Sequence, residues 1–496
     1  MLEHLKQEAN QTFTENGALT NRSSGSELLD LFATIGALRE APAEEIETRF
    51  LRAFTEDPTL ALKILFYARD VRGGLGERRV FRILLCWLAR NHPESLLKNL
   101  ELIPEYGRWD DLLPLLDTPC RNGALLVLVR QLKADAAALR RGEAVSLLGK
   151  WLPSVNASSR ETVRQGRDLA RAMGLSERNY RRLLSRLRAR IRILENNLRE
   201  RDYSFDYEKQ PSKAMLKYRK AFHRNDPERY AAFLDRVEAG EAKLHTGTLL
   251  PYELVEPFLN MQNYWKHHNF CAPLSPEETR TLNLTWAQLE DFAGDENALA
   301  VVDTSGSMYS ADRPMPAAVA ISLGLYFAER AKGPYRNHYI TFSANPQLIE
   351  LKGATFAARL RYICSFNEIA NTNLQGVFDL ILRTAVKHGL PQSELPGKLY
   401  IISDMEFDSC VKNASLTNFQ AAKQAYEAAG YRLPELVFWN VNSRNRQQPV
   451  TVNDRGVALV SGCSPRIFSL VTGGNLDPVS YMLGVLNTER YAPIRA

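Results

Sequence analysis

The spacing of apolar residues changes near residue 290, and this change constrains the fold more than any other feature of the 496-residue chain. Before that point apolar residues recur at the three-to-four-residue spacing of one helix side. From Ala298 onward, short apolar runs typical of buried strands alternate with helical segments. The chain is also too long for a single hydrophobic core. We therefore predict an all-helical domain over residues 1–290 and a doubly wound α/β domain over residues 291–496.

The N-terminal half is divided into short amphipathic segments by Gly, Pro and Asp residues. Short helices with short connections are typical of stacked helix pairs, so we expect a HEAT-like repeat domain, although the sequence has no clean repeat of fixed period. The segments that we expect to be helical are Glu27–Leu38, Ala43–Phe54, Leu60–Arg69, Glu77–Arg90 and Pro93–Leu102.

The C-terminal half alternates expected strands with expected helices, which is the order of a parallel sheet with helical crossovers. The expected strands are Ala298–Val302, His338–Ser343, Gln347–Lys352, Lys398–Ser403 and Glu435–Asn440. The expected helices are Pro314–Lys332, Leu374–His388 and Asn418–Ala429.

Short polar side chains stand where three of these elements begin or end. They are Asp303, Ser305 and Ser307 after the first strand, Thr372 before a helix, and Asp404 after a later strand. The carboxyl ends of parallel strands share one sheet edge, where ligands bind, so the five side chains can converge. Carboxylate and hydroxyl oxygens suit hard cations, which predicts a site for Mg²⁺ or another divalent cation such as Mn²⁺. The alternative is a Ser-rich turn in which Asp303 caps the next helix.

Positive charge is concentrated in a basic segment, residues 160–224. This segment holds 19 Lys or Arg against 8 Asp or Glu, whereas the whole chain has a net charge of only +6. Aromatic residues are interleaved with the cations, as in surfaces that bind single-stranded RNA. We therefore predict RNA contacts from Arg178, Arg182, Arg186, Arg190, Lys213, Lys217, Lys220, His223 and Arg224. The alternative is a solvated helix face with aromatics in the core.

A glycine-rich run, Arg72-Gly-Gly-Leu-Gly-Glu-Arg78, opens one of the expected helices. It lacks the Gly-Lys-Ser/Thr of a nucleotide-binding loop and follows a helix rather than a strand. Backbone amides at a helix start can still hold a phosphate, and Arg72 and Arg78 join the predicted RNA contacts for this reason. A turn between two helices, in which glycine relieves backbone strain, is the other interpretation and is favoured by the context.

These patterns resemble those of two protein families. The Asp303-x-Ser-x-Ser run with distal Thr372 and Asp404 resembles the metal-ion-dependent adhesion site (MIDAS) of von Willebrand factor A domains, although Met405 replaces the usual glycine after the second aspartate. The helical half followed by such a domain resembles the Ro autoantigen family with its TROVE module, and most closely an uncharacterised bacterial and viral branch. The segments that carry this resemblance are Tyr67–Arg78, Tyr106–Asp111, Asp303–Met308, Ser403–Asp408 and Leu459–Ser464. The resemblance implies a ribonucleoprotein whose helical repeats bind small RNAs.

Several protein classes are excluded by composition. No stretch approaches the roughly 20 apolar residues of a membrane span, and the N-terminus lacks a secretory core, so we expect a cytoplasmic protein without a membrane contact. Six scattered cysteines form no Cys-x-x-Cys pair, so neither a zinc module nor a disulfide framework is indicated.

Three functions are compatible with these patterns. We favour a Ro-like scaffold for small non-coding RNA that is not an enzyme, because no His or Glu adjoins the metal loops as a general base. The second is a protein-interaction adaptor whose metal site grips an acidic residue of a partner. The third, the least favoured, is a metal-dependent nuclease or phosphatase.

Overall fold

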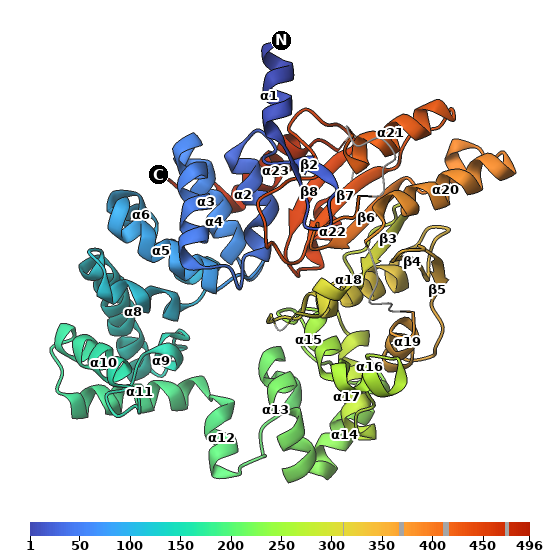
Figure 1. Cartoon of the computed structure of the whole chain (residues 1–496). Helices are drawn as coiled ribbons and strands as arrows, with labels where there is room; N and C mark the ends of the chain where they lie inside the picture. The colour runs from blue at the N-terminus through green and yellow to red at the C-terminus, as the bar shows by residue number, and fades with distance from the viewer. Residues whose placement is uncertain (311, 367–371, 410–415, 472–475) are drawn as a thin grey trace. The chain divides into compact units, whose positions relative to one another are not determined.

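The computed structural model describes residues 1–310, 312–366, 372–409, 416–471 and 476–496 (Figure 1). Two compact units are present. The sheet unit comprises residues 1–60 and 234–488, and the helical unit comprises residues 61–233 and 489–496. The predicted combination of a helical part with an α/β sheet is confirmed. The domain boundary expected near residue 290 stays a prediction, since compact units need not coincide with domains.

The sheet unit is built on six strands in the order β5-β4-β3-β6-β7-β8. They are β3 (Ala298–Asp303), β4 (His338–Phe342), β5 (Leu348–Glu350), β6 (Lys398–Ser403), β7 (Glu435–Asn440) and β8 (Val457–Ser461). The edge strand β5 is antiparallel to β4, and all other neighbours are parallel. Every residue of β3, β6 and β8 is buried, so both faces of the sheet are covered, because alternate side chains point to opposite faces.

The chain reverses its direction of travel across the sheet between β3 and β6. After β3 the chain continues to β4 on one side and then returns to β6 on the other side of β3. The two strands end level with each other, since Val302 pairs with Ile402. Open α/β sheets bind ligands beyond the carboxyl ends of strands at such a switch point. The loops after β3 and β6 are therefore the expected place for a ligand site.

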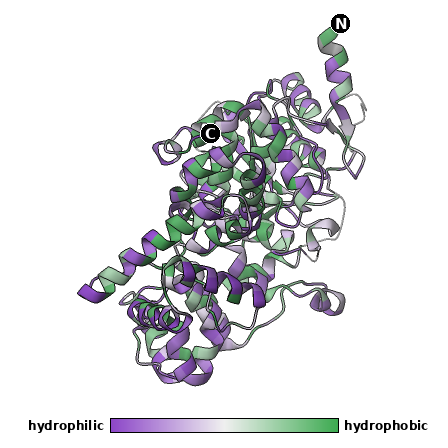
Figure 2. Ribbon diagram, turned by 90° about the vertical axis from the view of Figure 1, so that its left-hand side faces the viewer, coloured by the Kyte–Doolittle hydropathy of each residue, from purple (hydrophilic) through white to green (hydrophobic). Residues whose placement is uncertain are grey.

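Helices enclose this sheet. Those of the sheet unit are α1 (Leu2–Asn10), α2 (Glu27–Thr34), α3 (Ala43–Glu56), α15 (Tyr252–Val255), α16 (Met261–His267), α17 (Pro276–Ala287), α18 (Pro316–Arg330), α19 (Phe356–Ile363), α20 (Leu374–His388), α21 (Asn418–Ala428), α22 (Arg466–Leu470) and α23 (Pro478–Leu486). The central helix α18 lies directly on β3, because a Cβ added at Gly324 would come 2.2 Å from a methyl carbon of Val302. Figure 2 shows hydrophobic residues gathered in the middle of the packed structure and a mixed pattern on α1 at the N-terminus.

The N-terminal residues belong to the sheet unit, which the sequence pattern did not predict. A short antiparallel hairpin, β1 (Gln11–Phe13) and β2 (Leu19–Asn21), precedes α2. Beyond α2 the Gly36 amide donates a 3.0 Å hydrogen bond to Ser461 Oγ at the end of β8. The ring of Phe32 on α2 meets that of Tyr481 on α23 edge to face, with centroids 5.9 Å apart. The first helices thus cover the β8 side of the sheet.

The helical unit contains the remaining helices. They are α4 (Pro58–Arg69) and α14 (Pro227–Glu238), which cross into the sheet unit, and α5 (Arg79–Asn91), α6 (Pro93–Asn99), α7 (Ile103–Tyr106), α8 (Arg121–Arg141), α9 (Leu148–Trp151), α10 (Arg160–Ala172), α11 (Glu177–Ile191), α12 (Leu194–Glu200) and α13 (Ser212–Asn225). The long helix α8 contacts α9, α10, α11 and the 3-10 helix η3 (Trp109–Asp117). Among the described helices of the whole chain, none is long and apolar enough to cross a lipid bilayer.

The packing of α2 on the sheet gives a stability prediction. Phe32 is 2% exposed, and replacing it by Ala removes a buried ring, so Phe32→Ala should lower the free energy of unfolding by ~3 to 5 kcal/mol. Urea unfolding followed by circular dichroism measures this change. Leu51→Ala on α3 is the matched control, because Leu51 is 46% exposed and its truncation should cost less than about 0.5 kcal/mol. Equal effects of the two substitutions would contradict the assignment of α2 to the core of the sheet unit.

Candidate functional site

Asp303 is fully buried at the end of β3. Its Oδ1 accepts a 2.9 Å hydrogen bond from the Ser305 amide, and its Oδ2 accepts a 2.5 Å bond from the Ser403 hydroxyl of β6. The carboxylate is therefore held in a fixed orientation at the switch point between the two strands.

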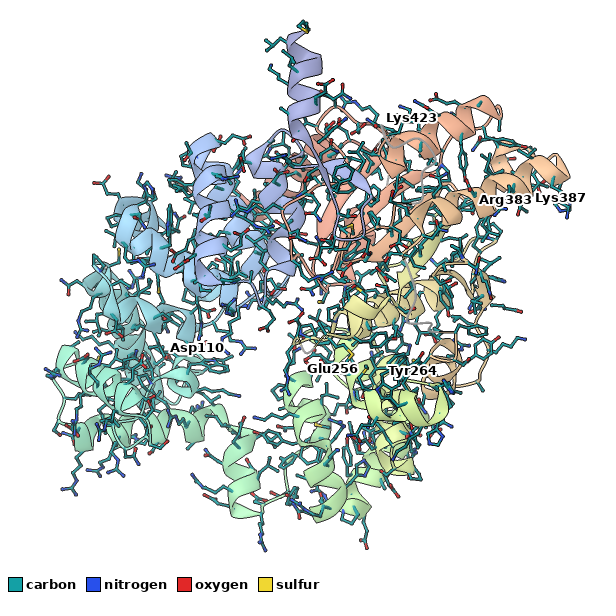
Figure 3. All side chains as sticks on the ribbon, in the orientation of Figure 1. Asp110, Glu256, Tyr264, Arg383, Lys387 and Lys423 are labelled. Carbon is teal, nitrogen blue, oxygen red and sulfur yellow. The ribbon has the colours of Figure 1, made fainter. Side chains whose placement is uncertain are left out.

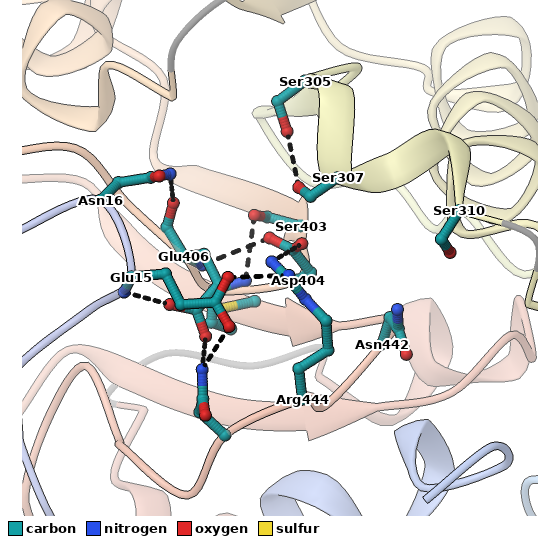
Figure 4. Close-up of polar contacts among 12 residues, drawn as sticks. Glu15, Asn16, Ser305, Ser307, Ser310, Ser403, Asp404, Glu406, Asn442 and Arg444 are labelled. Carbon is teal, nitrogen blue, oxygen red and sulfur yellow. Dashed lines mark hydrogen bonds and ion pairs between the residues drawn. The ribbon is translucent and has the colours of Figure 1, made fainter.

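The two serines of the Asp303 loop also face each other. Ser305 and Ser307 flank the start of a single 3-10 turn, η6 (Gly306–Tyr309), and their Oγ atoms lie 3.2 Å apart (Figure 4). Ser305 is buried and Ser307 is half-buried. The tight turn thus presents two neighbouring hydroxyl oxygens beside a carboxylate.

Asp404 follows β6 and is only 2% exposed. The next residue, Met405, adopts a left-handed backbone conformation with φ of 67°. Such a conformation costs a side-chain-bearing residue roughly 1 to 2 kcal/mol, which explains why glycine suits this position in the resembling family. The Ser403 hydroxyl oxygen accepts a 3.1 Å bond from the Met405 amide and so supports the strained turn.

The two aspartates influence each other electrostatically. Burial, and then repulsion from Asp404, raise the pKa of Asp303 to about 7. Hydrogen bonds from Ser403 and Ser305 act in the opposite direction without offsetting the increase. Two buried carboxyl groups in such proximity favour the binding of a cation, since a cation removes the cost of charging both.

Thr372 is held next to the loop after β6. Its backbone carbonyl accepts a 3.0 Å hydrogen bond from the Asp408 amide, and the residue is 1% exposed. The following residue, Asn373, caps α20 by accepting a hydrogen bond from the Gly376 amide at 2.7 Å. The backbone therefore brings the third predicted loop to the same sheet edge as Asp404.

These residues fit a divalent cation. Asp303, Asp404, Ser305 and Ser307 supply oxygen atoms of the kind that Mg²⁺ and Mn²⁺ prefer, and Thr372 would add a hydroxyl. The described ranges hold no group of three or more His, Cys, Asp or Glu side chains arranged for a metal ion, so a cation here would depend on hydroxyl oxygens beside the two carboxylates. The metal assignment stays a prediction that the geometry at the switch point favours.

An arginine occupies the outer side of this site. Arg444 Nη2 lies 3.0 Å from Asp404 Oδ2, and Arg444 Nη1 lies 2.7 Å from Glu15 Oε2 (Figure 4). The guanidinium group is about one-third exposed, whereas the Asp404 side chain is nearly inaccessible. Arg444 therefore serves as a positive counter-charge of Asp404.

Glu15 reaches this site because the N-terminal hairpin is docked beside it. The Thr14 hydroxyl donates to the Phe407 carbonyl at 2.6 Å, and the Glu15 amide donates to Glu406 Oε2 at 2.8 Å. Glu406 also accepts hydrogen bonds from Asn445 and Gln447, at 2.9 and 2.7 Å. Sequence reasoning missed both Glu15 and Arg444, because no local pattern links positions so far apart in the chain.

The predicted RNA contacts lie in the helical unit. On α11, Arg178, Arg182, Arg186 and Arg190 are all exposed. Arg190 donates a 3.1 Å hydrogen bond to the Glu143 carbonyl, which anchors the end of the helix. The other three form a stripe with i, i+4 spacing along one side of α11.

The contacts predicted on α13 are more mixed. Lys217, Lys220 and Arg224 are exposed, whereas Lys213 and His223 are half-buried. The interleaved aromatics do not all face solvent: Tyr207 and Phe222 are buried and pack against each other with centroids 5.2 Å apart. For these two rings the core interpretation is the right one.

The glycine-rich run forms a turn between α4 and α5. Arg72 donates a 2.9 Å hydrogen bond to the Glu105 carbonyl, and Arg78 pairs with Asp110. A Cβ at Gly74 would lie 2.0 Å from the Tyr67 carbonyl oxygen, so the turn requires glycine there. The helix-helix turn is thus present, and the two arginines are partly engaged within the protein.

Comparison with protein families gives two matches. Residues 14–126 and 157–292, about half of the chain, match a family described as Domain of unknown function (DUF2828). Residues 297–477, which contain the candidate metal site, match a second one described as Domain of unknown function (DUF7788).

A curated protein and a solved structure can be aligned over nearly the whole chain. Uncharacterized protein L728 of Acanthamoeba polyphaga mimivirus is 28% identical over 528 aligned positions, which cover 98% of this chain and 89% of the viral protein. The crystal structure of the Deinococcus radiodurans RO (RSR) protein aligns with a TM-score of 0.49 and 15% identity, covering 95% of this chain and 100% of that one.

The position of Arg444 gives a prediction about metal affinity. Since Arg444 competes with a cation for Asp404, Arg444→Ala should strengthen Mn²⁺ or Mg²⁺ binding roughly threefold to tenfold, measured by isothermal titration calorimetry. Arg446→Ala is the matched control, because this substitution removes the same charge from an arginine that pairs with Glu45. If both substitutions change the affinity equally, or if Arg444→Ala weakens binding, Arg444 is not a competitor for the site.

Proposed function

The chain belongs to the family described as Domain of unknown function (DUF2828), and we propose that it is a scaffold that binds small non-coding RNA through the helical unit. The observation that carries the proposal is a row of exposed arginines on α11 that lack acidic partners.

The row consists of Arg178, Arg181, Arg182 and Arg186. Among the residues that the structure describes, none of these guanidinium groups forms an ion pair, although arginines on neighbouring helices do. Arg130 pairs with Glu101, Arg141 with Glu143 and Arg164 with Asp117, at 2.8, 2.7 and 2.6 Å. No described carboxylate therefore offsets the charge of these α11 arginines, which can attract an anionic ligand.

The helix beneath the row is firmly held. Tyr180, Leu184 and Leu187 are buried at helical spacing on the opposite side of α11. Arg188, unlike its exposed neighbours, turns inward and donates to the carbonyl oxygens of Gly149 and Leu152 at 3.0 and 2.8 Å. A rigid helix that presents aligned guanidinium groups can contact successive phosphates without a cost for ordering its backbone.

RNA is the polyanion that such a surface fits. Phosphate contacts from arginine release condensed counterions, so binding gains strength at low salt. The charge excess is confined to residues 160–224 of a chain with a net charge of only +6, which indicates a local binding surface rather than a generally basic protein.

A scaffold role without catalysis fits the surroundings of the candidate metal site. Glu406 and Glu15 are additional carboxylates there. Glu406 is engaged by the Glu15 amide and by Asn445 and Gln447, and Glu15 pairs with Arg444. A general base needs a free lone pair directed at substrate. We therefore propose that a bound cation has a structural or adhesive role.

The candidate metal site supports a second function, that of a protein adaptor. A cation held by Asp303, Ser305 and Ser307 with an open coordination position would accept a carboxylate from a protein partner. Chelation would abolish such an interaction but would leave RNA binding by α11 unchanged, so the two functions can be separated.

Neutralising the arginine row tests the favoured function. The triple variant Arg178→Gln, Arg182→Gln and Arg186→Gln should weaken binding of single-stranded RNA, and the slope of log K against log salt should decrease by about 2, at roughly 0.7 per phosphate contact. Filter binding or fluorescence anisotropy over a salt series measures both quantities.

The matched control removes three arginines that already have acidic partners. Arg130→Gln, Arg141→Gln and Arg164→Gln change the net charge of the same unit by the same amount, but should leave the salt slope nearly unchanged. Equal slopes for the two triple variants would show that net charge, and not the α11 row, governs binding.

A further inference from the structure

A second basic site is formed where the glycine-rich turn meets η3. Asp111 is fully buried, and its Oδ2 and Oδ1 accept hydrogen bonds from Arg69 Nε at 2.8 Å and Arg82 Nε at 2.7 Å. The Arg108 amide donates to Asp111 Oδ2 at 2.9 Å. The approach is so close that a Cβ at Gly107 would lie 2.4 Å from that same oxygen. Two segments that stood apart in the sequence thus form one charged cluster within the helical unit.

Asp110 is the second carboxylate of this cluster (labelled in Figure 3). It pairs with Arg78, and Arg82 Nη2 lies 2.8 Å from its Oδ2. Four guanidinium groups, those of Arg69, Arg78, Arg82 and Arg108, therefore surround only two carboxylates. The cluster has an excess of two positive charges.

Arg108 carries most of this imbalance. Throughout the described part of the chain, no carboxylate pairs with its guanidinium group, which instead lies 4.9 Å from the centroid of the Trp151 ring. Burial, then repulsion from Arg69, together with repulsion from Arg78, lower the pKa of Arg108. A cation in this position is destabilised until an anion reaches it.

The inner arginines of the cluster are occupied by its two carboxylates. Arg69 Nη2 lies 2.7 Å from Asp111 Oδ2, and Arg82 Nη2 lies 2.8 Å from Asp110 Oδ2. The cluster is accessible from solvent, because the Arg78 side chain is 46% exposed and that of Arg82 is 25% exposed. Lys150 adds a further cation over the Trp151 ring, at 5.5 Å from its centroid.

We propose that this cluster, centred on Arg108, binds a single phosphate group. Planar guanidinium forks match the oxygens of a phosphate, and a phosphate dianion would neutralise the excess charge of the cluster. The phosphate is either part of an RNA backbone or a free phosphomonoester. The RNA source rests on the proposed function, whereas the phosphate site itself does not.

The experiment uses the full-length protein and two probes. Inorganic phosphate is titrated by calorimetry, and a single-stranded 12-nucleotide RNA is titrated with and without a 5′-phosphate. Arg108→Gln removes one guanidinium group and should weaken inorganic phosphate binding at least tenfold. Arg108→Lys keeps the charge but not the fork, and should recover part of the affinity. Arg141→Gln is the control, because Arg141 is exposed and pairs with Glu143.

The outcomes separate the site from the proposed function. A larger effect of Arg108→Gln on the 5′-phosphorylated RNA assigns the site to a terminal phosphomonoester, and equal effects on both RNAs assign it to a backbone phosphate. Phosphate binding that is lost in Arg108→Gln, in a protein that binds no RNA, supports the site and contradicts the RNA scaffold. Absence of saturable phosphate binding, or identical phosphate binding by wild type and by folded Arg108→Gln and Arg108→Lys proteins, overturns the site, and RNA binding that persists in that case leaves the scaffold intact.

Discussion

The burial of two carboxyl groups at the ends of adjacent parallel strands is the constraint on which the sheet unit depends. Asp303 and Asp404 stand at the switch point between β3 and β6, at the last residue of β3 and the first residue after β6. Burying like charges together is costly unless hydrogen bonds and counter-charges compensate. Ser403, the Ser305 amide and Arg444 supply part of that compensation, and Arg444 also pairs with Glu15. The docking of the N-terminal hairpin is therefore linked to the electrostatics of the sheet edge.

Much of the sheet was predictable because its strands are buried on both faces. The expected strands Ala298–Val302, Lys398–Ser403 and Glu435–Asn440 agree with β3, β6 and β7 to within one residue. Strand β8 was missed although Val457-Ala-Leu-Val-Ser461 is wholly buried, because a short apolar run alone cannot distinguish a strand from a helix. The three-residue strands β1 and β2 leave too short a pattern to detect. The aspartates and serines of the site could be placed because they follow strands, and the position after a strand is fixed by topology.

Contacts over long sequence separations explain what the sequence could not reveal. Arg444 and Glu15 are more than 400 positions apart, and Arg108 lies near Arg69 because the Arg108 amide and Arg69 Nε both donate to Asp111. The density of positive charge suggested that the nearby aromatic rings face a ligand, but Tyr207 and Phe222 lie in the helical core. In a basic segment the decisive information is which cations already have a carboxylate, and only the folded chain provides it. By that criterion Arg178, Arg182, Arg186 and Arg108 stand out from the paired arginines of the same unit.

The helical unit and the sheet unit present two different chemistries, one for polyanions and one for a hard cation. The most direct test of the account is to purify the protein from its own host, extract the nucleic acid that co-purifies, and measure rebinding over a salt series with and without EDTA. We predict discrete small RNAs that rebind with a steep salt dependence in both conditions. Absence of co-purifying RNA and of rebinding at low salt, together with a protein partner that is lost on chelation, would contradict it and leave the adaptor function.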